Sequence, residues 1–498
     1  MQFTAVFDIG TTAVKAVLVS DTKEMAFSHS LPLETIYRRE YKEQDPNEWY
    51  RVFCSISALM VKKVPAEKIR GIIMSGQMQD LIPVDDAGEA LGNAVLYSDT
   101  RADKEASHIN SLVGEDRIRK ITGNNMDASI PAAKLFWLKE HEKERFRKTA
   151  CFLGSSKDFI ILKLCGKFTG DYTAASTFGL MDIHTKCWSN LMLESLSIST
   201  KLFPELFSTG TPCGNVTKTG SGQTGFCEGT PVYAGAGDAG ASTLSAGITE
   251  PGEYSIYLGT TGWIASVSRD VMTRQGVFNL SAIPRDLYIN VVPFLNAGGV
   301  HKWISDLLWS PEFGTPKYDY IDSLLEQSEA GSGGLFFLPY LSGERFPVMD
   351  AKTRGAFIGL TNETTKAQMV RACLEGIAFS IRQGLEAISS EKPGKISLVG
   401  GGAKTPVWRQ IIADVLGTPI TVTVDSSEYL PSVALASAVF IDQGLEESYN
   451  SFLSSLPVLK ELTYNPSLPS ALMDERYHKY LKLYPAIKVL FNQETTCV

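Results

Sequence analysis

The sequence predicts a mixed α/β protein with two large domains, and three observations lead to this prediction. The chain has 498 residues, 44% of them hydrophobic, and a chain of this size normally divides its core among two or more domains. A strand, a turn of glycine and threonine, and a second strand occur near the start and again near the middle. Elsewhere, apolar residues at helical spacing alternate with short apolar runs, which is typical of helices that cover sheets.

The repeated unit is expected to form one β-hairpin in each domain. Its strands are expected at Phe3–Phe7, Ala13–Val19, Tyr254–Leu258 and Trp263–Val267. The turns between them are Asp8-Ile-Gly-Thr-Thr12 and Gly259-Thr-Thr-Gly262. Two such units about 250 residues apart suggest a duplicated architecture. The predicted domains are therefore residues 1–246 and residues 247–498.

Two helices have clear start signals. Asp45-Pro46-Asn47-Glu48 and Thr365-x-x-Gln368 both have the pattern of a capping box, the first with proline at the first helical position. The second helix leads into a strand at Ile396–Val399, a turn at Gly400-Gly-Gly402 and a helix at Pro406–Leu416. Residues 208–229 and 310–334 are rich in Gly, Ser, Thr and Pro, so loops are expected there.

Composition excludes several classes of protein. The 47 basic and 55 acidic side chains give a formal charge of −8 without a dense basic cluster, so nucleic acid is not an expected partner. The eight cysteines are scattered without a C-x-x-C pair, which favours neither a zinc site nor disulfides. No apolar segment reaches the about 18 residues that a membrane span needs, and the N-terminus lacks a leader pattern. We expect a cytoplasmic protein.

The first turn has the composition of a phosphate site. Glycine permits a positive φ, so successive backbone N–H groups of the turn converge on one point beside the hydroxyls of Thr11 and Thr12. The carboxylate of Asp8 is suited to hold the waters of a Mg²⁺ ion that bridges phosphates. An ordinary glycine hairpin is the alternative interpretation.

The later glycine clusters strengthen the phosphate hypothesis. The turn Gly259–Gly262 duplicates the first, and Gly400–Gly402 leaves room for a flat ring or a ribose beside the backbone, although a purely structural turn is the alternative there. The sequence contains neither a P-loop nor a dinucleotide fingerprint.

One carboxylate has the surroundings of a catalytic base. Asp238 follows a strand expected at Pro231–Ala234 and lies among small residues that leave space for a substrate. Phosphoryl transfer requires little of the protein beyond positioning, charge neutralisation and a base near the attacking hydroxyl. A helix cap is the competing role for Asp238.

These segments, in this order, resemble the FGGY carbohydrate kinases over nearly the whole chain, and the xylulokinase branch in particular. The motifs that carry the resemblance are Ser75–Gln79, Ser129–His141, Phe337–Arg345, Gly355–Glu375 and Leu398–Trp408. The resemblance implies a ribonuclease-H-like (actin-like ATPase) fold in each half, with ATP and a sugar bound in the cleft between them. It assigns sugar binding and the base to residues 1–246, and nucleotide binding to residues 247–498.

The resemblance also implies individual roles. Asp238 is the expected base and Asp8 the metal-associated carboxylate. The expected nucleotide-binding residues are Thr11, Thr12, Gly259, Thr260, Thr261, Gly298, Gly401 and Gly402. The expected sugar-binding residues are Met78, Gln79, Asp99 and Arg101. The implied cofactors are ATP and Mg²⁺, and a homodimer is an open alternative.

Two departures from the family pattern concern the substrate. Gln79 stands where the branch has a sugar-contacting histidine, and Ala239 stands where an amide is common. A xylulose-like ketose is the expected substrate, with another ketose, a polyol or an aldonate such as gluconate as alternatives. Two rival interpretations are a non-metabolic actin-like ATPase and a sugar-binding regulator without catalysis.

Overall fold

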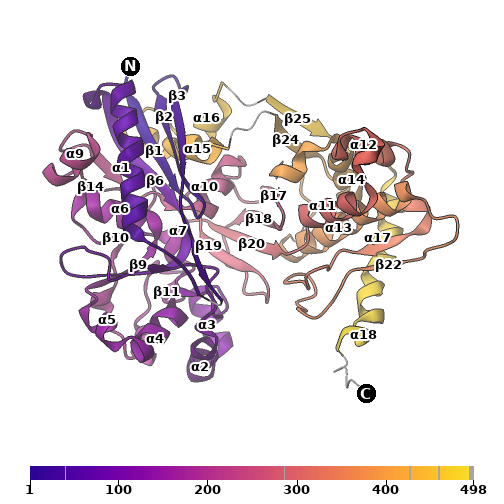
Figure 1. Ribbon diagram of the computed structural model, residues 1–498, viewed down its shortest axis with the longest axis horizontal. Coiled ribbons are helices and arrows are strands. Elements are labelled where there is room, and N and C mark those ends of the chain that lie inside the picture. Colours follow the sequence, from indigo (N-terminus) through magenta and orange to yellow (C-terminus); the bar gives the residue numbers. More distant parts are fainter. Residues whose placement is uncertain (40, 285, 390, 425–427, 458–459, 493–498) are drawn as a thin grey trace. The chain divides into compact units, whose positions relative to one another are not determined.

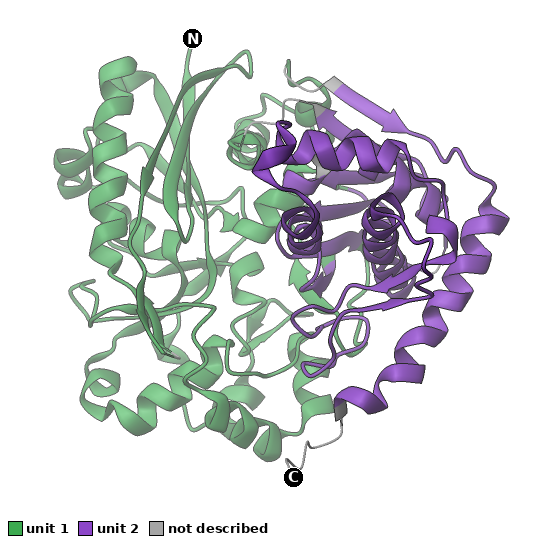
Figure 2. Ribbon diagram, turned by 45° about the vertical axis from the view of Figure 1, so that its right-hand side comes forward, with its two compact units in different colours: residues 1–249, 268–289, 425–459 green, residues 250–267, 290–424, 460–498 purple. Residues whose placement is uncertain are grey.

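The computed structural model describes residues 1–498 except 40, 285, 390, 425–427, 458–459 and 493–498. The chain forms two compact units (Figure 2). The first unit contains residues 1–249, 268–289 and 425–459, and the second contains residues 250–267, 290–424 and 460–498. Two later segments thus pack with the N-terminal part, so the compact units are not contiguous halves. The division of roles between residues 1–246 and 247–498 stays a prediction.

The first unit is built on a sheet with the strand order β14-β15-β6-β1-β2-β3, and β16 also pairs with β6. The strands are β1 (Phe3–Ile9), β2 (Ala13–Ser20), β3 (Met25–Pro32), β6 (Ile69–Gly76), β14 (Pro212–Asn215), β15 (Pro231–Tyr233) and β16 (Ala236–Gly237). β1 and β2 are antiparallel, which confirms the predicted hairpin, whereas β6 runs parallel to β1, β15 and β16.

Helices cover both faces of this sheet because successive residues of β1 point to opposite sides. Phe7 packs in the same core as α1 (Pro46–Lys63) and α6 (Ser156–Cys165). Val6 packs on the other side, against α15 (Leu430–Asp442). Figure 1 shows α1 and α6 on one side of β1 and β6, with α15 and α10 (Asp238–Ser245) on the other. This three-layer arrangement is the predicted α/β pattern.

The start of α1 follows the sequence signal in part. Asp45 caps the helix by accepting a hydrogen bond from the Asn47 N–H at 2.9 Å, and Pro46 is the first helical residue. The predicted capping box is not completed, because the Glu48 carboxylate accepts from the Glu34 N–H instead. In α13, by contrast, the reciprocal bonds between Thr365 and Gln368 are both present.

A second sheet of the first unit has the order β4-β5-β8-β7-β9, and helices α4, α5 and α6 contact its strand β7. Its strands are β4 (Ile36–Arg38), β5 (Tyr41–Gln44), β7 (Met78–Val84), β8 (Ala94–Val95) and β9 (Cys151–Ser155). The further strands of the first unit are β10 (Thr169–Asp171), β11 (Met181–Asp182), β12 (Cys187–Trp188), β13 (Glu205–Phe207) and β19 (Phe278–Ser281). Its further helices are η1 (Ala66–Lys68), α2 (Asp103–Val113), α3 (Glu115–Thr122), α4 (Pro131–His141), α5 (Lys143–Lys148), α7 (Tyr172–Ala175), α8 (Asn190–Ser195), η2 (Thr200–Leu202), α9 (Lys218–Thr224) and α16 (Tyr449–Ser454).

The second unit contains a sheet in which β20, β18, β17, β23, β24 and β25 are neighbours in that order. Its strands are β17 (Tyr254–Leu258), β18 (Gly262–Ser268), β20 (Tyr288–Phe294), β23 (Ile396–Val399), β24 (Ile420–Val424) and β25 (Lys460–Tyr464), with β21 (Phe336–Leu338) and β22 (Ala356–Ile358) as a separate pair. The helices are α11 (Gly298–Leu308), η3 (Pro311–Phe313), α12 (Lys317–Glu326), η4 (Ser332–Gly334), α13 (Lys366–Ile388), η5 (Gly401–Lys404), α14 (Pro406–Leu416), α17 (Ser470–Ile487) and α18 (Val489–Asn492). β17 and β18 form the second predicted hairpin.

Two regions predicted to be loops contain regular structure. Residues 208–229 include β14 and α9, and residues 310–334 include the ten-residue helix α12. In α12 the buried residues Ile321, Leu324 and Leu325 make an apolar face at helical spacing. Burial of that face stabilises a helix despite the glycine and serine residues around it, so the loop prediction was wrong there.

Among the helices that the structure describes, none combines the length and the apolar character that crossing a bilayer requires.

Candidate active site

The two key carboxylates of the first unit lie at the same edge of its main sheet. In the strand register, Asp8 of β1 and Ala236 of β16 both stand opposite Ser75 of β6. β6 runs parallel to both strands, so Asp238, two residues after Ala236, emerges beside the turn that follows Asp8. The Ser75 hydroxyl donates to Asp8 Oδ1 at 2.8 Å. Burial raises the pKa of Asp8, while Ser75 and the charge of Lys15 lower it by smaller amounts.

The turn after Asp8 is held by two glutamines that the motif analysis did not select. The Thr11 hydroxyl donates to Gln77 Oε1 at 2.9 Å, and Gln44 Nε2 donates to the Thr11 carbonyl at 2.6 Å. Gln77 Nε2 in turn donates to Gln44 Oε1 at 2.8 Å. Both glutamines are buried, so this network fixes the turn. Thr12 is exposed in the same turn.

Asp238 is held by backbone geometry that glycine makes possible. Gly235 has φ +67°, and a Cβ there would collide with the Met74 carbonyl oxygen. A Cβ on Gly237 would collide with Met78, so that side chain packs directly beneath the backbone that precedes Asp238. These close approaches bring Asp238 to the start of α10 beside the predicted sugar-binding segment.

The contacts of Asp238 fit a base better than a cap. Gly237 occupies the N-cap position of α10, and Asp238 Oδ1 accepts a hydrogen bond from the adjacent N–H of Ala239, at 2.8 Å. Burial raises the pKa of Asp238 to about 7, with repulsion from Asp8 as the second cause. The carboxyl therefore titrates near neutral pH.

The backbone of the predicted sugar-binding segment accepts a hydrogen bond from the buried side chain of Lys134. Gln79 has the unusual φ of +61°, and its carbonyl accepts a hydrogen bond from Lys134 Nζ at 2.9 Å. Lys134 also donates to the Leu96 carbonyl at 2.6 Å. Burial lowers the pKa of Lys134 to about 7, against the attraction of nearby acids, of which Asp80 is the strongest.

Asp80 is a further carboxylate that the sequence analysis did not select. Its side chain is fully buried, and burial raises its pKa well above the ordinary value. Lys134 opposes this increase, whereas the charge of Asp238 adds to it. Asp8, Asp80 and Asp238 thus form one electrostatically linked acidic group, which we call the carboxylate cluster.

Asp99 and Arg101, both predicted to lie near the sugar, are paired with protein groups. The Asp99 carboxylate accepts from Arg101 Nε at 2.9 Å, from Arg101 Nη2 at 2.7 Å and from the Lys42 N–H at 2.6 Å. Arg101 also donates to Glu43 at 2.6 Å, and its guanidinium stacks 4.0 Å from the Tyr41 ring centroid. This network joins β5 to the start of α2. Its contacts suit a structural support, and direct sugar binding by the two residues stays a prediction.

The second unit contains a cavity of about 520 Å³ around its glycine turns. Five of the predicted nucleotide-binding residues line it: Gly259, Thr260, Gly298, Gly401 and Gly402. Thr261 is exposed and lies outside this lining. The volume lies within the range of pockets that hold ligands of nucleotide size.

Glycine is required at this cavity because backbones approach closely. The Gly298 N–H donates to the Gly259 carbonyl at 2.8 Å, and a Cβ on Gly298 would lie 2.5 Å from that oxygen. Gly400 has φ +98°, and a Cβ there would lie 2.5 Å from the Leu258 carbonyl oxygen. Gly401, in contrast, has open space where its Cβ would stand. The cavity floor is therefore made of backbone, which lets a ligand come close.

Sequence reasoning missed the side chains that form the rest of this cavity. His301, Lys302, Tyr318, Asp322 and Thr405 line it with Gly299 and Trp408. Tyr318 and Asp322 belong to α12, which lies in a region predicted to be a loop. The helical spacing of Ile321, Leu324 and Leu325 is the signal that would have revealed them.

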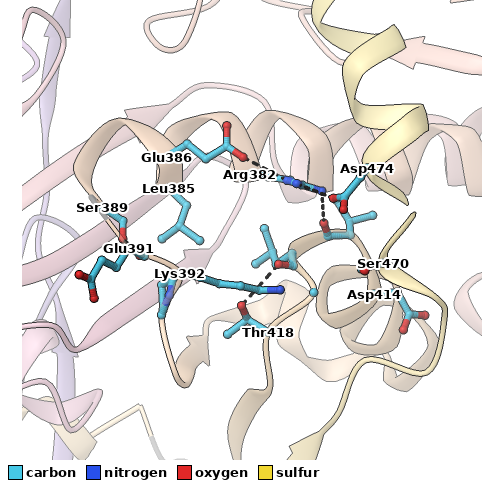
Figure 3. A pocket seen from close by; sticks show the side chains of 14 residues that line it. Arg382, Leu385, Glu386, Ser389, Glu391, Lys392, Asp414, Thr418, Ser470 and Asp474 are labelled. Carbon is cyan, nitrogen blue, oxygen red and sulfur yellow. Dashed lines mark hydrogen bonds and ion pairs between the residues drawn. The ribbon is translucent and has the colours of Figure 1, made fainter. Parts of the chain in front are cut away.

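Another cavity of the second unit, of about 390 Å³, lies where α13, α14 and α17 meet (Figure 3). Arg382 pairs with Asp474 at 2.7 Å and with Glu386 at 3.2 Å. Asp414 accepts from the Ser467 N–H at 2.6 Å. Because these charges have partners within the protein, we interpret this cavity as a packing feature and not as a ligand site.

Comparison with known proteins defines the class of this protein. The N-terminal domain model of the FGGY family of carbohydrate kinases matches residues 3–245, and the C-terminal domain model matches residues 256–438. The chain therefore belongs to the FGGY family of carbohydrate kinases, and it is an ATP-dependent kinase that phosphorylates a sugar hydroxyl.

Within that family the chain is similar to xylulose kinases. It is 31% identical to the xylulose kinase of Staphylococcus xylosus over 460 residues, which cover 91% of this chain and 92% of that protein. The crystal structure of xylulose kinase from Rhodospirillum rubrum matches with a TM-score of 0.91 at 26% identity, covering 99% of this chain and 100% of that one. The gluconokinase of Bacillus subtilis is 28% identical over 427 residues, which cover 83% of each protein.

The comparisons confirm the two-domain α/β fold and the sugar kinase that the sequence predicts. They decide against a non-metabolic actin-like ATPase and against a regulator without catalysis. The roles of the individual site residues stay predictions.

Proposed function

We propose that this protein transfers the γ-phosphoryl group of ATP to a hydroxyl of a neutral ketose of the xylulose type. The carboxylate cluster of the first unit is the observation that carries this choice. The charge of Asp8 raises the pKa of Asp238, and the charge of Asp238 raises that of Asp80, while Lys134 donates to two backbone carbonyls. A neutral sugar avoids the repulsion that a sugar acid meets beside these carboxylates.

Asp238 acts as the base in this proposal. Its carboxylate accepts the proton of the sugar hydroxyl as the oxygen attacks phosphorus, and a pKa of about 7 leaves it both ionised and proton-attracting near neutral pH. Met78 and Gln79 bind the sugar next to it, supported by Lys134. Asp99 and Arg101, which bond to each other, to Glu43 and to the Lys42 N–H, hold the neighbouring segment in place.

ATP is proposed to occupy the cavity of the second unit. Its adenosine lies along Gly401 and Gly402, next to Gly298, and its phosphates are bound by the backbone and hydroxyls of Gly259, Thr260 and Thr261. Phosphate binding by Thr11 and Thr12 of the first turn stays a prediction. The glycine floor of the cavity supports this placement, since a nucleoside needs backbone that no Cβ covers.

A Mg²⁺ ion is the implied cofactor, and Asp8 fits it. Mg²⁺ prefers oxygen ligands and usually keeps waters and substrate phosphates beside one or two carboxylates. Among the described residues no group of three or more His, Cys, Asp or Glu side chains is arranged around a point that could hold a metal. The donor set at Asp8 therefore suits an ion that arrives with ATP, and the ion supplies neutralisation of the phosphate charge.

Gluconate is the second candidate substrate. The likeness to a gluconokinase supports it, as do the departures from the xylulokinase pattern at Gln79 and Ala239. A cytoplasmic location is supported by the seven cysteines of the described residues, all of which are free thiols. A homodimer remains a further alternative, which the molecular mass in solution would decide.

A coupled assay of ADP release tests the substrate. D-xylulose, D-ribulose, L-ribulose, glycerol and D-gluconate are compared at equal concentration with ATP and Mg²⁺. We expect the highest kcat/KM for a ketopentose and the lowest for gluconate. A clear preference for gluconate would contradict the proposal.

A double variant sharpens this test. Gln79→His with Ala239→Asn restores two polar side chains of the xylulokinase pattern, each able to contribute about 0.5–1.5 kcal/mol through a hydrogen bond. Preference for D-xylulose should rise by about 5- to 150-fold if both bonds form in the transition state. Each single variant is measured as well, because neighbouring changes need not be additive.

A further inference from the structure

The cavity of the second unit is lined by three residues that each have a polar side-chain atom without a hydrogen-bond partner in the described part of the protein. These atoms are His301 Nε2, Asp322 Oδ1 and Trp408 Nε1, and all three are buried. The His301 residue as a whole is only 6% exposed. Buried polar atoms nearly always have a partner, so a ligand is the natural source of the missing bonds.

The position of these atoms within the cavity is set by their neighbours. The His301 ring lies 5.2 Å from the Trp408 ring in an edge-on contact and 5.6 Å from Tyr318. A Cβ on Gly402 would lie 2.7 Å from the Trp408 ring, so His301 belongs to the end of the cavity where adenosine is proposed. Asp322 follows Tyr318 by four residues on α12, and the two side chains therefore share one helix face.

The other end of the cavity has the character of a phosphate site. Gly298 and Gly299 donate backbone hydrogen bonds to the turn at Gly259 and Thr260, at 2.8 and 2.9 Å. No carboxylate is among the residues of this end. Asp322 is thus associated with the nucleoside part of a nucleotide and not with its phosphates.

The chemistry of the unpaired atoms selects a ligand group that both donates and accepts hydrogen bonds. The indole Nε1 of Trp408 only donates. An ionised carboxylate only accepts hydrogen bonds. His301 is neutral at physiological pH, because burial, assisted by the charge of Lys317, lowers its pKa to about 4. A ribonucleotide presents two adjacent hydroxyls, on C2′ and C3′, between its base and its phosphates. A carboxylate suits such a pair of donors.

We propose that Asp322, with His301 beside it, binds the ribose hydroxyls of the nucleotide and makes the cavity selective for ribonucleotides over deoxyribonucleotides. The inference rests on the proposed placement of ATP in this cavity. It goes beyond that placement by assigning the discrimination to one carboxylate on α12.

Direct nucleotide binding tests this inference without the kinase reaction. ADP, 2′-deoxy-ADP and 3′-deoxy-ADP are titrated calorimetrically into the 498-residue protein in the absence of sugar. We expect the wild-type protein to bind ADP about 10-fold or more tightly than at least one deoxy analogue, since a hydrogen bond to a charged group is lost.

Variants on α12 assign the effect to Asp322. Asp322→Asn keeps the side-chain shape but removes the charge, and it should weaken ADP binding to the level of the deoxy analogue while changing the affinity of that analogue less than about 2-fold. Asp319→Asn is the matched control, because Asp319 is exposed on the same helix and lies outside the cavity lining. Burial and then the charge of Asp319 raise the pKa of Asp322, so Asp319→Asn favours the ionised form of Asp322 and should keep the preference for ADP. His301→Phe keeps the ring packing and should lose a smaller part of the discrimination.

Several outcomes would overturn the inference. Equal affinities of the wild type for ADP and both deoxy analogues would do so, as would discrimination that persists in Asp322→Asn. If Asp322→Asn lost its selectivity for ADP over GDP but kept the preference for ribose over deoxyribose, Asp322 would recognise the base and not the ribose. Inactivity towards every sugar of the panel in a protein that binds ADP with this selectivity would contradict the proposed substrate and leave the inference standing.

Discussion

The two glycine and threonine turns of this chain have the same hairpin form but different supports. The turn after Asp8 in the first unit is held by side chains, through Gln77, Gln44 and Ser75. The turn at Gly259 in the second unit is held by backbone, through the N–H groups of Gly298 and Gly299. One duplicated motif is thus stabilised by polar side chains in one unit and by close backbone approach in the other.

This difference separates the roles of the two turns. Side-chain support places ionisable groups together. In the first unit, burial raises the pKa values of both Asp8 and Asp238, and repulsion from Asp8 raises that of Asp238 further. Backbone support leaves an open floor, and it is in the second unit that the turn lines a cavity. The first turn should therefore respond to changes of charge and hydrogen bonding, and the second to added side-chain volume.

The largest expected effect is that of Asp238→Asn. Loss of the general base should lower kcat by about 10²-fold or more, with little change in ADP affinity. Steady-state kinetics and calorimetric titration of ADP measure the two quantities. Activity like that of the wild type would remove Asp238 from the mechanism.

The same substitution should stabilise the protein at high pH. The folded-state pKa of Asp238, about 7, lies above the ordinary value of 3.8, so ionising this carboxyl in the folded protein costs free energy as the pH rises through 7. Asn removes that cost, and the free energy of unfolding at pH 8 should rise by about 1–3 kcal/mol. The gain should shrink as the pH falls to 5. Urea denaturation at the two pH values measures it, and a loss of stability at pH 8 would contradict the assignment.

An intermediate effect is expected from a pair of alanine substitutions in the second unit. A Cβ on Gly298 would stand 2.5 Å from the Gly259 carbonyl oxygen, so Gly298→Ala should displace the second turn and weaken ADP binding by about 10- to 100-fold. Gly401→Ala is the matched control for backbone geometry, because its Cβ meets open space within the protein. Gly401→Ala should disturb the turn little, so any effect should be on the affinity for the nucleotide and not on stability. Equal stability losses in both variants would show that the close approach is not what holds the turn.

The smallest expected effect comes from the glutamine network of the first turn. Gln77→Leu retains the volume but removes the bond from Thr11 and the bond to Gln44, and kcat/KM for ATP should fall by about 3- to 10-fold. Gln223→Leu, which removes the acceptor of the Tyr50 hydroxyl elsewhere in the first unit, is the control and should leave kcat/KM unchanged. If both variants lose the same amount, the network has no specific role in the turn.

The sequence predicted most of what depends on local pattern. The hairpin around Asp8, the capping box at Thr365 and the helix at Pro406–Leu416 appear as expected, because strand alternation, capping residues and proline position are local signals. The nucleotide-side glycines also gather at one cavity as expected.

What the sequence did not predict depends on contacts between distant residues. Asp80 and Lys134 become an interacting buried pair only because β7 and α4 pack together. Asp99 accepts two hydrogen bonds from the Arg101 guanidinium and one each from the backbone N–H groups of Lys42 and Arg101, and no sequence motif indicates that its oxygens have these partners. Asp322 was not selected because the composition around α12 is typical of a loop, although the apolar residues within α12 recur at helical spacing.

The most direct test of the account is the pH dependence of kcat/KM for the sugar, in the wild type and in Asp8→Asn. The central claim is that Asp8 and Asp238 interact at one sheet edge and that Asp238 is the base. In the wild type, kcat/KM should rise with pH along a limb of unit slope and level off above a midpoint of about 7, because the base must lose its proton in the free enzyme. In Asp8→Asn the activity should be lower, and the midpoint should move to lower pH, since the like charge that raises the pKa of Asp238 is gone. A flat profile between pH 5.5 and 8.5, or a midpoint that Asp8→Asn leaves in place, would contradict the claim.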